Sequence, residues 1–277
     1  MRVEKWHGAG NDFLVVDGRG AAAPQDWSAW ARAACDRRRG VGADGLLVLE
    51  PDADLDFRMH YRNADGGEAD MCGNGGRVLA AFAVGLGLGE GGRLRFRSVW
   101  GAHVARVEPS GPGHFDVALS LPDVPAPTRL AVDAPWGRAQ AVRVACGVPH
   151  LVVPVGETPA RDIEAVDVAG WAPALRRLPE LGPAGANVDF VELDAGGTLL
   201  LRTFERGVEG ETLACGTGAT ATAAAATGLG WGKPPWRVRT RSGDLLEVGF
   251  ELGPGTLTGV VLRGPAVRVF ATEYEPA

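Results

Sequence analysis

The stretch Met71-Cys72-Gly73-Asn74-Gly75-Gly76-Arg77 precedes an Ala-rich apolar run in the first half of the chain. A similar stretch, Ala214-Cys215-Gly216-Thr217-Gly218-Ala219-Thr220, precedes a second Ala-rich run. The two cysteines are 215 − 72 = 143 positions apart, about half of the 277 residues. A repeat on this scale predicts two like domains, each with a helix of small residues that begins just after the cysteine.

A cysteine placed at a helix N-terminus has a chemical use. The first turn leaves backbone N–H groups without partners and carries a partial positive charge. Such a position lowers the pKa of a thiol from about 8.5, to as low as roughly 3.5 in some proteins, so the sequence favours a thiolate. Glycines let the backbone approach an anion closely. Each Cys-Gly-x-Gly turn therefore predicts a proton-transferring group beside a carboxylate-binding loop.

Two such turns together indicate inversion of a carbon stereocentre. A proton must leave one face of the carbon and another must arrive at the opposite face, so one thiolate and one thiol suffice. The helix N-termini would stabilise the charge that develops on the substrate carboxylate. A single Cys-Gly is more often only a small residue at a tight turn, and the argument depends on the pair.

Composition excludes several other classes. The net charge of −6, from 28 Lys and Arg against 34 Asp and Glu, gives no electrostatic case for nucleic acid. The best apolar run, residues 78–89, is too short for a bilayer, and the N-terminus lacks a signal-peptide pattern. We therefore expect a cytoplasmic protein. Four dispersed cysteines do not resemble a disulfide framework, and Cys35 and Cys146 are expected in the core.

The remaining pattern predicts many strands and few helices. Apolar residues at helical spacing predict a helix from Trp27 to Cys35, and a second helix is expected at 165–178 with an interruption near Pro173. Alternation or turn punctuation predicts strands at 55–61, 93–100, 116–121, 142–146, 236–240, 245–250 and 267–270. The best internal boundary is 109–127, which is rich in proline and glycine.

Several motifs in order resemble the diaminopimelate epimerase family. Besides the two cysteine turns they are Lys5–Phe13, Gly40–Gly45, Arg62–Gly66, Gly147–His150, Asn187–Phe190, Phe204–Gly207 and Gly210–Gly218. The resemblance implies an α+β fold of two pseudo-symmetric domains, each a mostly antiparallel β-sheet wrapped around a central helix, with the active site in the cleft between them. The implied domains are 1–114 plus 262–277, which holds Cys72, and 115–261, which holds Cys215.

The same resemblance implies roles for residues. Cys72 and Cys215 would be the acid and base, tuned by His150 toward Cys72 and Glu205 toward Cys215. The reacting carboxylate would be held by Gly73, Asn74, Gly216 and Thr217. The distal end of the substrate would be recognised by Asn11, Asn63, Asn187, Glu205 and Arg206, since a guanidinium fork suits a carboxylate.

The implied activity is cofactor-independent interconversion of LL- and meso-diaminopimelate in lysine biosynthesis. The expected partner is a small-molecule amino acid, with no cofactor, metal, nucleic acid or membrane, and a homodimer is left open. Two alternatives remain: a racemase for another amino acid on the same scaffold, and a non-catalytic ligand-binding relative. A zinc site is disfavoured because no CxxC or HxxxH spacing exists, and Gly8-Ala9-Gly10 is better explained as a turn than as a dinucleotide loop.

Overall fold

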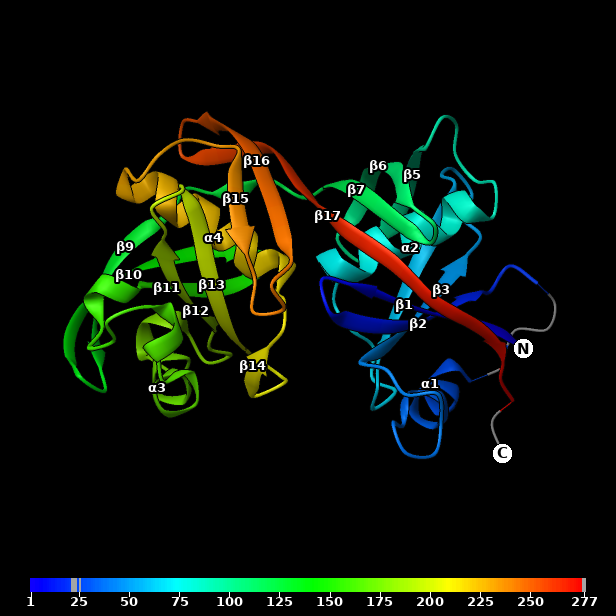
Figure 1. Ribbon diagram of the computed structural model, residues 1–277, viewed down its shortest axis with the longest axis horizontal. Coiled ribbons are helices and arrows are strands. Elements are labelled where there is room, and N and C mark those ends of the chain that lie inside the picture. Colours follow the sequence, from blue (N-terminus) through cyan, green and yellow to red (C-terminus); the bar gives the residue numbers. More distant parts are fainter. Residues whose placement is uncertain (21–23, 25, 276–277) are drawn as a thin grey trace. The chain divides into compact units, whose positions relative to one another are not determined.

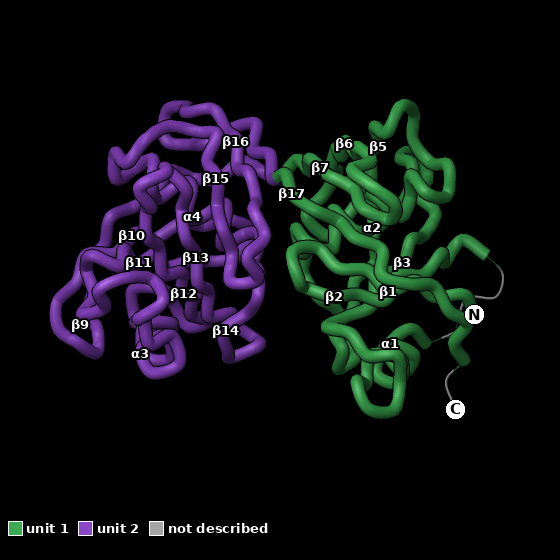
Figure 2. The backbone as a smooth tube through the Cα atoms, viewed as in Figure 1, with its two compact units in different colours: residues 1–120, 263–277 green, residues 121–262 purple. Residues whose placement is uncertain are grey.

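The computed structural model describes residues 1–20, 24 and 26–275 and divides the chain into two compact units. Unit 1 comprises Met1–Ser120 and Arg263–Ala277, and unit 2 comprises Leu121–Leu262 (Figure 2). The expected domain boundary after residue 114 falls inside β7 (His114–Ser120), after its first residue, whereas the observed division follows its last residue. The reason is pairing: β7 is hydrogen-bonded to two other strands of unit 1.

Unit 1 is a closed ring of strands (Figure 1). Its members are β1 (Arg2–Gly8), β2 (Asn11–Asp17), β3 (Gly45–Glu50), β4 (Phe57–Asn63), β5 (Arg93–Ser98), β6 (Gly101–Gly111), β7 and the second part of β17 (Thr256–Glu273). Each strand pairs with the next, and β17 closes the ring between β7 and β1. Only β2–β3 and β4–β5 are parallel among these pairs.

Helix α2 (Gly73–Gly85) occupies the middle of this unit, and every residue from Gly73 to Ala83 is buried. It contacts β1, β2, β3, β4, β6 and β7. A helix buried on all sides must be apolar or small all round, and the Gly and Ala content of α2 meets that need. Helix α1 (Trp27–Cys35) packs outside the ring, with Cys35 buried as expected.

Unit 2 repeats this chain order. Its strands are β8 (Val124–Pro125), β9 (Thr128–Ala134), β10 (Gly137–Cys146), β11 (Val148–Pro154), β12 (Asn187–Leu193), β13 (Thr198–Glu205), β14 (Gly210–Thr212), β15 (Trp236–Arg239), β16 (Leu245–Gly253) and the start of β17. Pairs β10–β11, β12–β13 and β15–β16 are antiparallel, while β11–β12 and β13–β15 are parallel. Unit 1 has the same sequence of pair types from β1 to β6, so the expected pseudo-symmetry is confirmed.

The central helix of unit 2 is α4 (Gly216–Leu229), buried from Gly216 to Ala226. It contacts β10, β11, β12, β13, β15 and β16. Cys146 lies in the core beside it, and burial raises the pKa of the Cys146 thiol to about 12. Both predicted helices that follow a cysteine are therefore present, and each is the axis of its own unit.

One helix differs from its prediction. The region 165–178 forms a short 3₁₀ turn (Ile163–Ala165) and then α3 (Val168–Leu175), and Pro173 lies inside that helix. Asp167 starts α3 because its side chain accepts a hydrogen bond from the Gly170 N–H. The expected interruption is thus at the N-terminal end and not at the proline.

Candidate functional site

Cys72 caps α2 in unit 1. It has extended backbone angles (φ −111°, ψ 122°), and it lies immediately before the buried helix. The Gly8-Ala9-Gly10 turn brings Asn11 to it, with Ala9 and Gly10 at φ 53° and 85°. The Cys72 Sγ lies 3.6 Å from Asn11 Oδ1, a hydrogen-bonding distance for the large sulfur atom. Asn74 Nδ2 reaches the same oxygen at 3.4 Å.

The buried side of this half-site contains a charge. Arg77 is completely buried, and its guanidinium donates to Asn74 Oδ1 at 2.8 Å and to the Gly73 carbonyl at 3.3 Å. Three residues predicted from the sequence, Asn11, Gly73 and Asn74, are therefore connected to Cys72 or to its helix.

Asn63 ends β4 and is exposed. Its backbone closes the predicted turn by bonds with Gly66 and Gly67. The structure does not connect it by a hydrogen bond to the Cys72 group in the described part of the chain.

Cys215 caps α4 in unit 2, also with extended angles (φ −119°, ψ 113°). Its Sγ accepts a hydrogen bond from the Gly218 N–H and lies 3.3 Å from Thr217 Oγ1. Cys215 is only 6% exposed, unlike the half-buried Cys72. The first turn of α4, Gly216-Thr217-Gly218, thus lies beside the thiol, as the sequence predicts.

The effect of the helix N-terminus does not decide the protonation of Cys215. Burial raises the pKa of this thiol well above its ordinary value, and the negative charges of Glu205 and Asp189 raise it further. The bonds from Thr217 and Gly218 act in the opposite direction but are outweighed. In this structure desolvation therefore exceeds the helix-terminus effect, and Cys215 is a protonated thiol near neutral pH.

A second polar group lies in unit 2. The Nδ1 of His150 lies 2.6 Å from Asp189 Oδ2, with both side chains fully buried, and Thr203 Oγ1 donates to Asp189 Oδ1 at 2.7 Å. Asn187 Nδ2 lies 3.5 Å from the other nitrogen of His150, and Asn187 Oδ1 accepts from the Arg206 backbone N–H at 2.8 Å. These contacts are mutually consistent when His150 carries its proton on Nδ1 and accepts at Nε2.

Three functional neighbours were not singled out from the sequence. Asp189 and Thr203 support His150, and Arg77 supports Asn74. The signal for Asp189 was its position two residues after Asn187 in a strand, which puts both side chains on the same face. Arg77 gave only the weak signal of a lone cation in an apolar run.

Neither half-site resembles a metal centre. Among residues 1–20, 24 and 26–275, no group of three or more His, Cys, Asp or Glu side chains is arranged to hold a metal ion. In the same described residues no helix is long and apolar enough to cross a membrane.

The fold is that of a class of two-unit α+β proteins found among solved structures. A probable proline racemase from Agrobacterium radiobacter K84 superimposes with a TM-score of 0.74 at 18% identity, covering 99% of this chain and 92% of that one. A phenazine biosynthesis protein of the PhzF family from Bacillus anthracis gives 0.73 at 17% identity, covering 99% of both chains. At such identities these two structures show the fold alone.

Sequence comparison identifies the family. The family model described as diaminopimelate epimerase matches residues 3–117 and 142–269. The diaminopimelate epimerase of Gemmatimonas aurantiaca is 42% identical, covering 91% of this chain and 88% of its own. That of Aquifex aeolicus is 38% identical, covering 98% and 96%. This chain belongs to the diaminopimelate epimerase family.

Proposed function

We propose that this protein interconverts LL- and meso-diaminopimelate by removing and returning the proton at the α-carbon, with Cys72 and Cys215 as the acid–base pair. The observation that carries the proposal is a repeated arrangement: in both units a cysteine occupies the N-cap position of the buried central helix, and the first turn of that helix contains glycines. Relatives named diaminopimelate epimerase match over nearly the whole chain, which supports this substrate.

Each thiol has a distinct starting role in this proposal. Cys215 is buried and protonated, so it is the donor that delivers a proton to one face of the carbon. Cys72 is the more accessible sulfur, and as a thiolate it removes the proton from the opposite face. In the reverse reaction the two exchange roles. No proton acceptor other than sulfur is needed, and no cofactor takes part.

The neighbouring groups supply binding. The backbone N–H groups of the first helical turn after each cysteine, at Gly73, Asn74, Gly216 and Thr217, hold the reacting carboxylate and stabilise the charge that develops when the proton leaves. Asn63, Asn187, Glu205 and Arg206 receive the distal amino-acid end. Asn187 is held in place from both sides, by His150 and by the Arg206 backbone. The tuning of Cys72 by His150 and of Cys215 by Glu205 stays a prediction.

We place this reaction in lysine biosynthesis, and we expect the enzyme to be cytoplasmic. The epimerase supplies the meso form, whose two α-centres have opposite configurations.

The deciding experiment follows the α-proton. The purified protein is incubated in D₂O with LL-diaminopimelate, and deuterium at the α-carbon and formation of the meso isomer are measured by NMR and chiral chromatography. We expect both to occur, and we expect proline, hydroxyproline and histidine to remain unlabelled. Labelling of one of these in place of diaminopimelate would assign another substrate, and binding without exchange would indicate a non-catalytic relative.

Matched cysteine variants test the assignment of the two thiols. Cys72→Ala and Cys215→Ala should each lower turnover by at least about 10³-fold, since general acid or base catalysis contributes about 10²–10⁴. Cys35→Ala and Cys146→Ala remove equally small thiols from the core and should leave the turnover of folded protein nearly unchanged. Near-normal epimerisation by either of the first two variants would disprove the two-thiol mechanism.

A further inference from the structure

A chain of oriented hydrogen bonds runs through unit 1 and ends at Asn11. It starts at Arg77, whose guanidinium can only donate, and it donates to Asn74 Oδ1 at 2.8 Å. Because the oxygen of Asn74 faces Arg77, the amide nitrogen of Asn74 faces Asn11, where it donates to Oδ1 at 3.4 Å. From this side the oxygen of Asn11 is required to be an acceptor.

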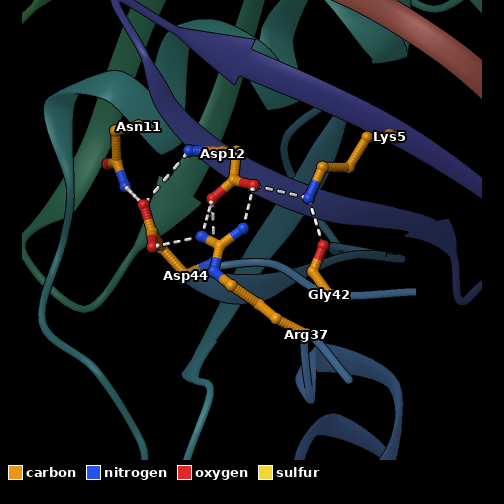
Figure 3. Close-up of polar contacts among 6 residues, drawn as sticks. All are labelled: Lys5, Asn11, Asp12, Arg37, Gly42 and Asp44. Atoms are coloured by element: carbon orange, nitrogen blue, oxygen red, sulfur yellow. Dashed lines mark hydrogen bonds and ion pairs between the residues drawn. The ribbon is translucent and has the colours of Figure 1, made fainter. Parts of the chain in front are cut away.

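The opposite side of Asn11 gives the same orientation. Asn11 Nδ2 donates to Asp44 Oδ2 at 2.8 Å, and a carboxylate can only accept. Arg37 holds this carboxylate by a 2.8 Å bond to Asp44 Oδ1 and also binds Asp12 (Figure 3). The two ends of the chain therefore agree, and they leave only one orientation for the Asn11 amide.

This orientation decides what Cys72 meets. Its sulfur lies 3.6 Å from Asn11 Oδ1, so it faces an acceptor and must donate its own proton. With the amide reversed, the sulfur would face an N–H group instead, and that arrangement would suit a thiolate. A hydrogen bond to the protonated form disfavours ionisation.

We propose that Asp44 is a positioning residue that acts through Asn11 to hold an acceptor against Cys72 and so keeps this sulfur protonated in the absence of substrate. The proposal deepens the function proposed above and depends on it for its catalytic meaning: Cys72 becomes the thiolate that removes the α-proton only after this hydrogen bond is given up and the half-buried thiol has released its own proton to solvent. Asp44 itself does not touch the sulfur in this arrangement.

The charges within this hydrogen-bonded network act in the opposite direction. The charged groups connected to this arrangement come from the loop before β3, from β1 and β2, and from α2: Arg37 and Asp44, Lys5 and Asp12, and Arg77. Three cations face two carboxylates, and a net positive surrounding favours a thiolate. The oriented amide therefore favours the thiol against the net charge of this network.

The test measures the reactivity of Cys72 without any turnover. The rate of its alkylation by iodoacetamide is followed across pH by peptide mapping in the wild type and in Asp44→Asn. Asparagine offers both a donor and an acceptor, so only the 3.4 Å bond from Asn74 still holds the Asn11 amide in its original orientation, and the reversed amide becomes populated. We expect the pH profile of Asp44→Asn to move to lower pH and the rate at pH 7 to rise about threefold or more, as the loss of one ordinary hydrogen bond implies.

A double-mutant cycle separates positioning from the charge of Asp44. In an Asn11→Ala background, Asp44→Asn should no longer change the alkylation rate. An equal acceleration in that background would show a direct charge effect and overturn the proposal, as would no acceleration at all in the single variant. Asp54→Asn, which removes an exposed carboxylate elsewhere in unit 1, should match the wild type.

The outcome is independent of whether the proposed function holds. A shifted Cys72 profile in a protein that does not exchange the α-proton would leave the positioning role in place and remove the epimerase activity. An unshifted profile in an active epimerase would remove the positioning role of Asp44 and leave the epimerase activity in place. In an active enzyme Asp44→Asn should also move the pH dependence of kcat/KM in the same direction as the alkylation profile.

Discussion

Asp189 Oδ2 lies 2.6 Å from His150 Nδ1, and neither side chain is exposed to solvent. The pair joins β11 to β12, and its carboxylate also contributes to the raised pKa of the Cys215 thiol, after burial and Glu205. A buried carboxylate is costly unless it is hydrogen-bonded, and here both of its oxygens accept one.

We predict that Asp189→Ala lowers the free energy of unfolding by about 3 kcal/mol, because it leaves His150 and Thr203 without an acceptor in the core. Asp189→Asn should lose much less, since an amide can accept from His150 and donate to the Thr203 hydroxyl. Urea unfolding of the full chain measures both. The exposed pair of Asp133 and Arg138 provides the control, and Asp133→Ala should cost under about 1 kcal/mol. An equal loss of unfolding free energy in the two Asp189 variants would show that the hydrogen bonds accepted by this side chain do not stabilise the core.

Gly218 packs against the same carboxylate. A β-carbon at Gly218 would lie 2.7 Å from Asp189 Oδ1, 3.1 Å from Thr203 Oγ1 and 3.2 Å from the Cys215 β-carbon. We predict that Gly218→Ala destabilises unit 2 by about 2 kcal/mol, since overpacking exceeds the gain in helix propensity. Gly249→Ala in β16, where a β-carbon meets no atom within 4 Å, should be neutral. Calorimetry of both variants is the measurement, and a stable Gly218→Ala would mean that the start of α4 can shift.

The sequence predicted much of this site because its signals are local. A cysteine followed by Gly-x-Gly and an Ala-rich run is enough to predict a buried helix with the cysteine at its N-cap position. Both such helices are found. The alternation that predicts β15 and β16 is likewise a property of consecutive residues.

The sequence could not predict features that depend on contacts between distant segments. Which of the two cysteines is the thiol could not be predicted, because burial by the rest of unit 2 and the charges of Glu205 and Asp189 raise the pKa of Cys215 against the effect of the helix terminus. The orientation of the Asn11 amide is set by residues 33 and 63 positions away, Asp44 and Asn74. Neither the burial nor the orientation is encoded in a short motif.

Acid should weaken unit 1 through Asp12. Burial alone would raise the pKa of this carboxyl, but hydrogen bonds and charges from Arg37 and Lys5 outweigh it and hold the pKa well below its usual range. A depressed folded-state pKa contributes stability that is present above the unfolded value of about 3.9 and is lost as pH falls below it. We predict that Asp12→Asn costs about 2 kcal/mol at pH 7 and progressively less from pH 5 to pH 2.

Urea unfolding of wild type and Asp12→Asn at several pH values checks this prediction. Asp133→Asn, at an exposed ion pair, should show a small difference that hardly changes with pH. A cost for Asp12→Asn that stayed constant down to pH 2 would mean that the carboxyl is not ionised in the folded protein.

The four thiols should differ in their reaction with iodoacetamide. Cys72 is half-buried, whereas burial raises the pKa of Cys35 and Cys146 to about 12 and raises that of Cys215 well above its ordinary value. Because the thiolate is the nucleophile, we predict that at pH 8 Cys72 is labelled at least about tenfold faster than Cys215. Since a raised pKa keeps Cys215 protonated, its labelling rate should still be rising at pH 10.

Peptide mapping gives the individual rates, and in 8 M urea all four should react alike. Labelling of Cys215 as fast as Cys72 in the folded protein would show that its sulfur is ionised, and the assignment of Cys215 as the resting proton donor would then be wrong.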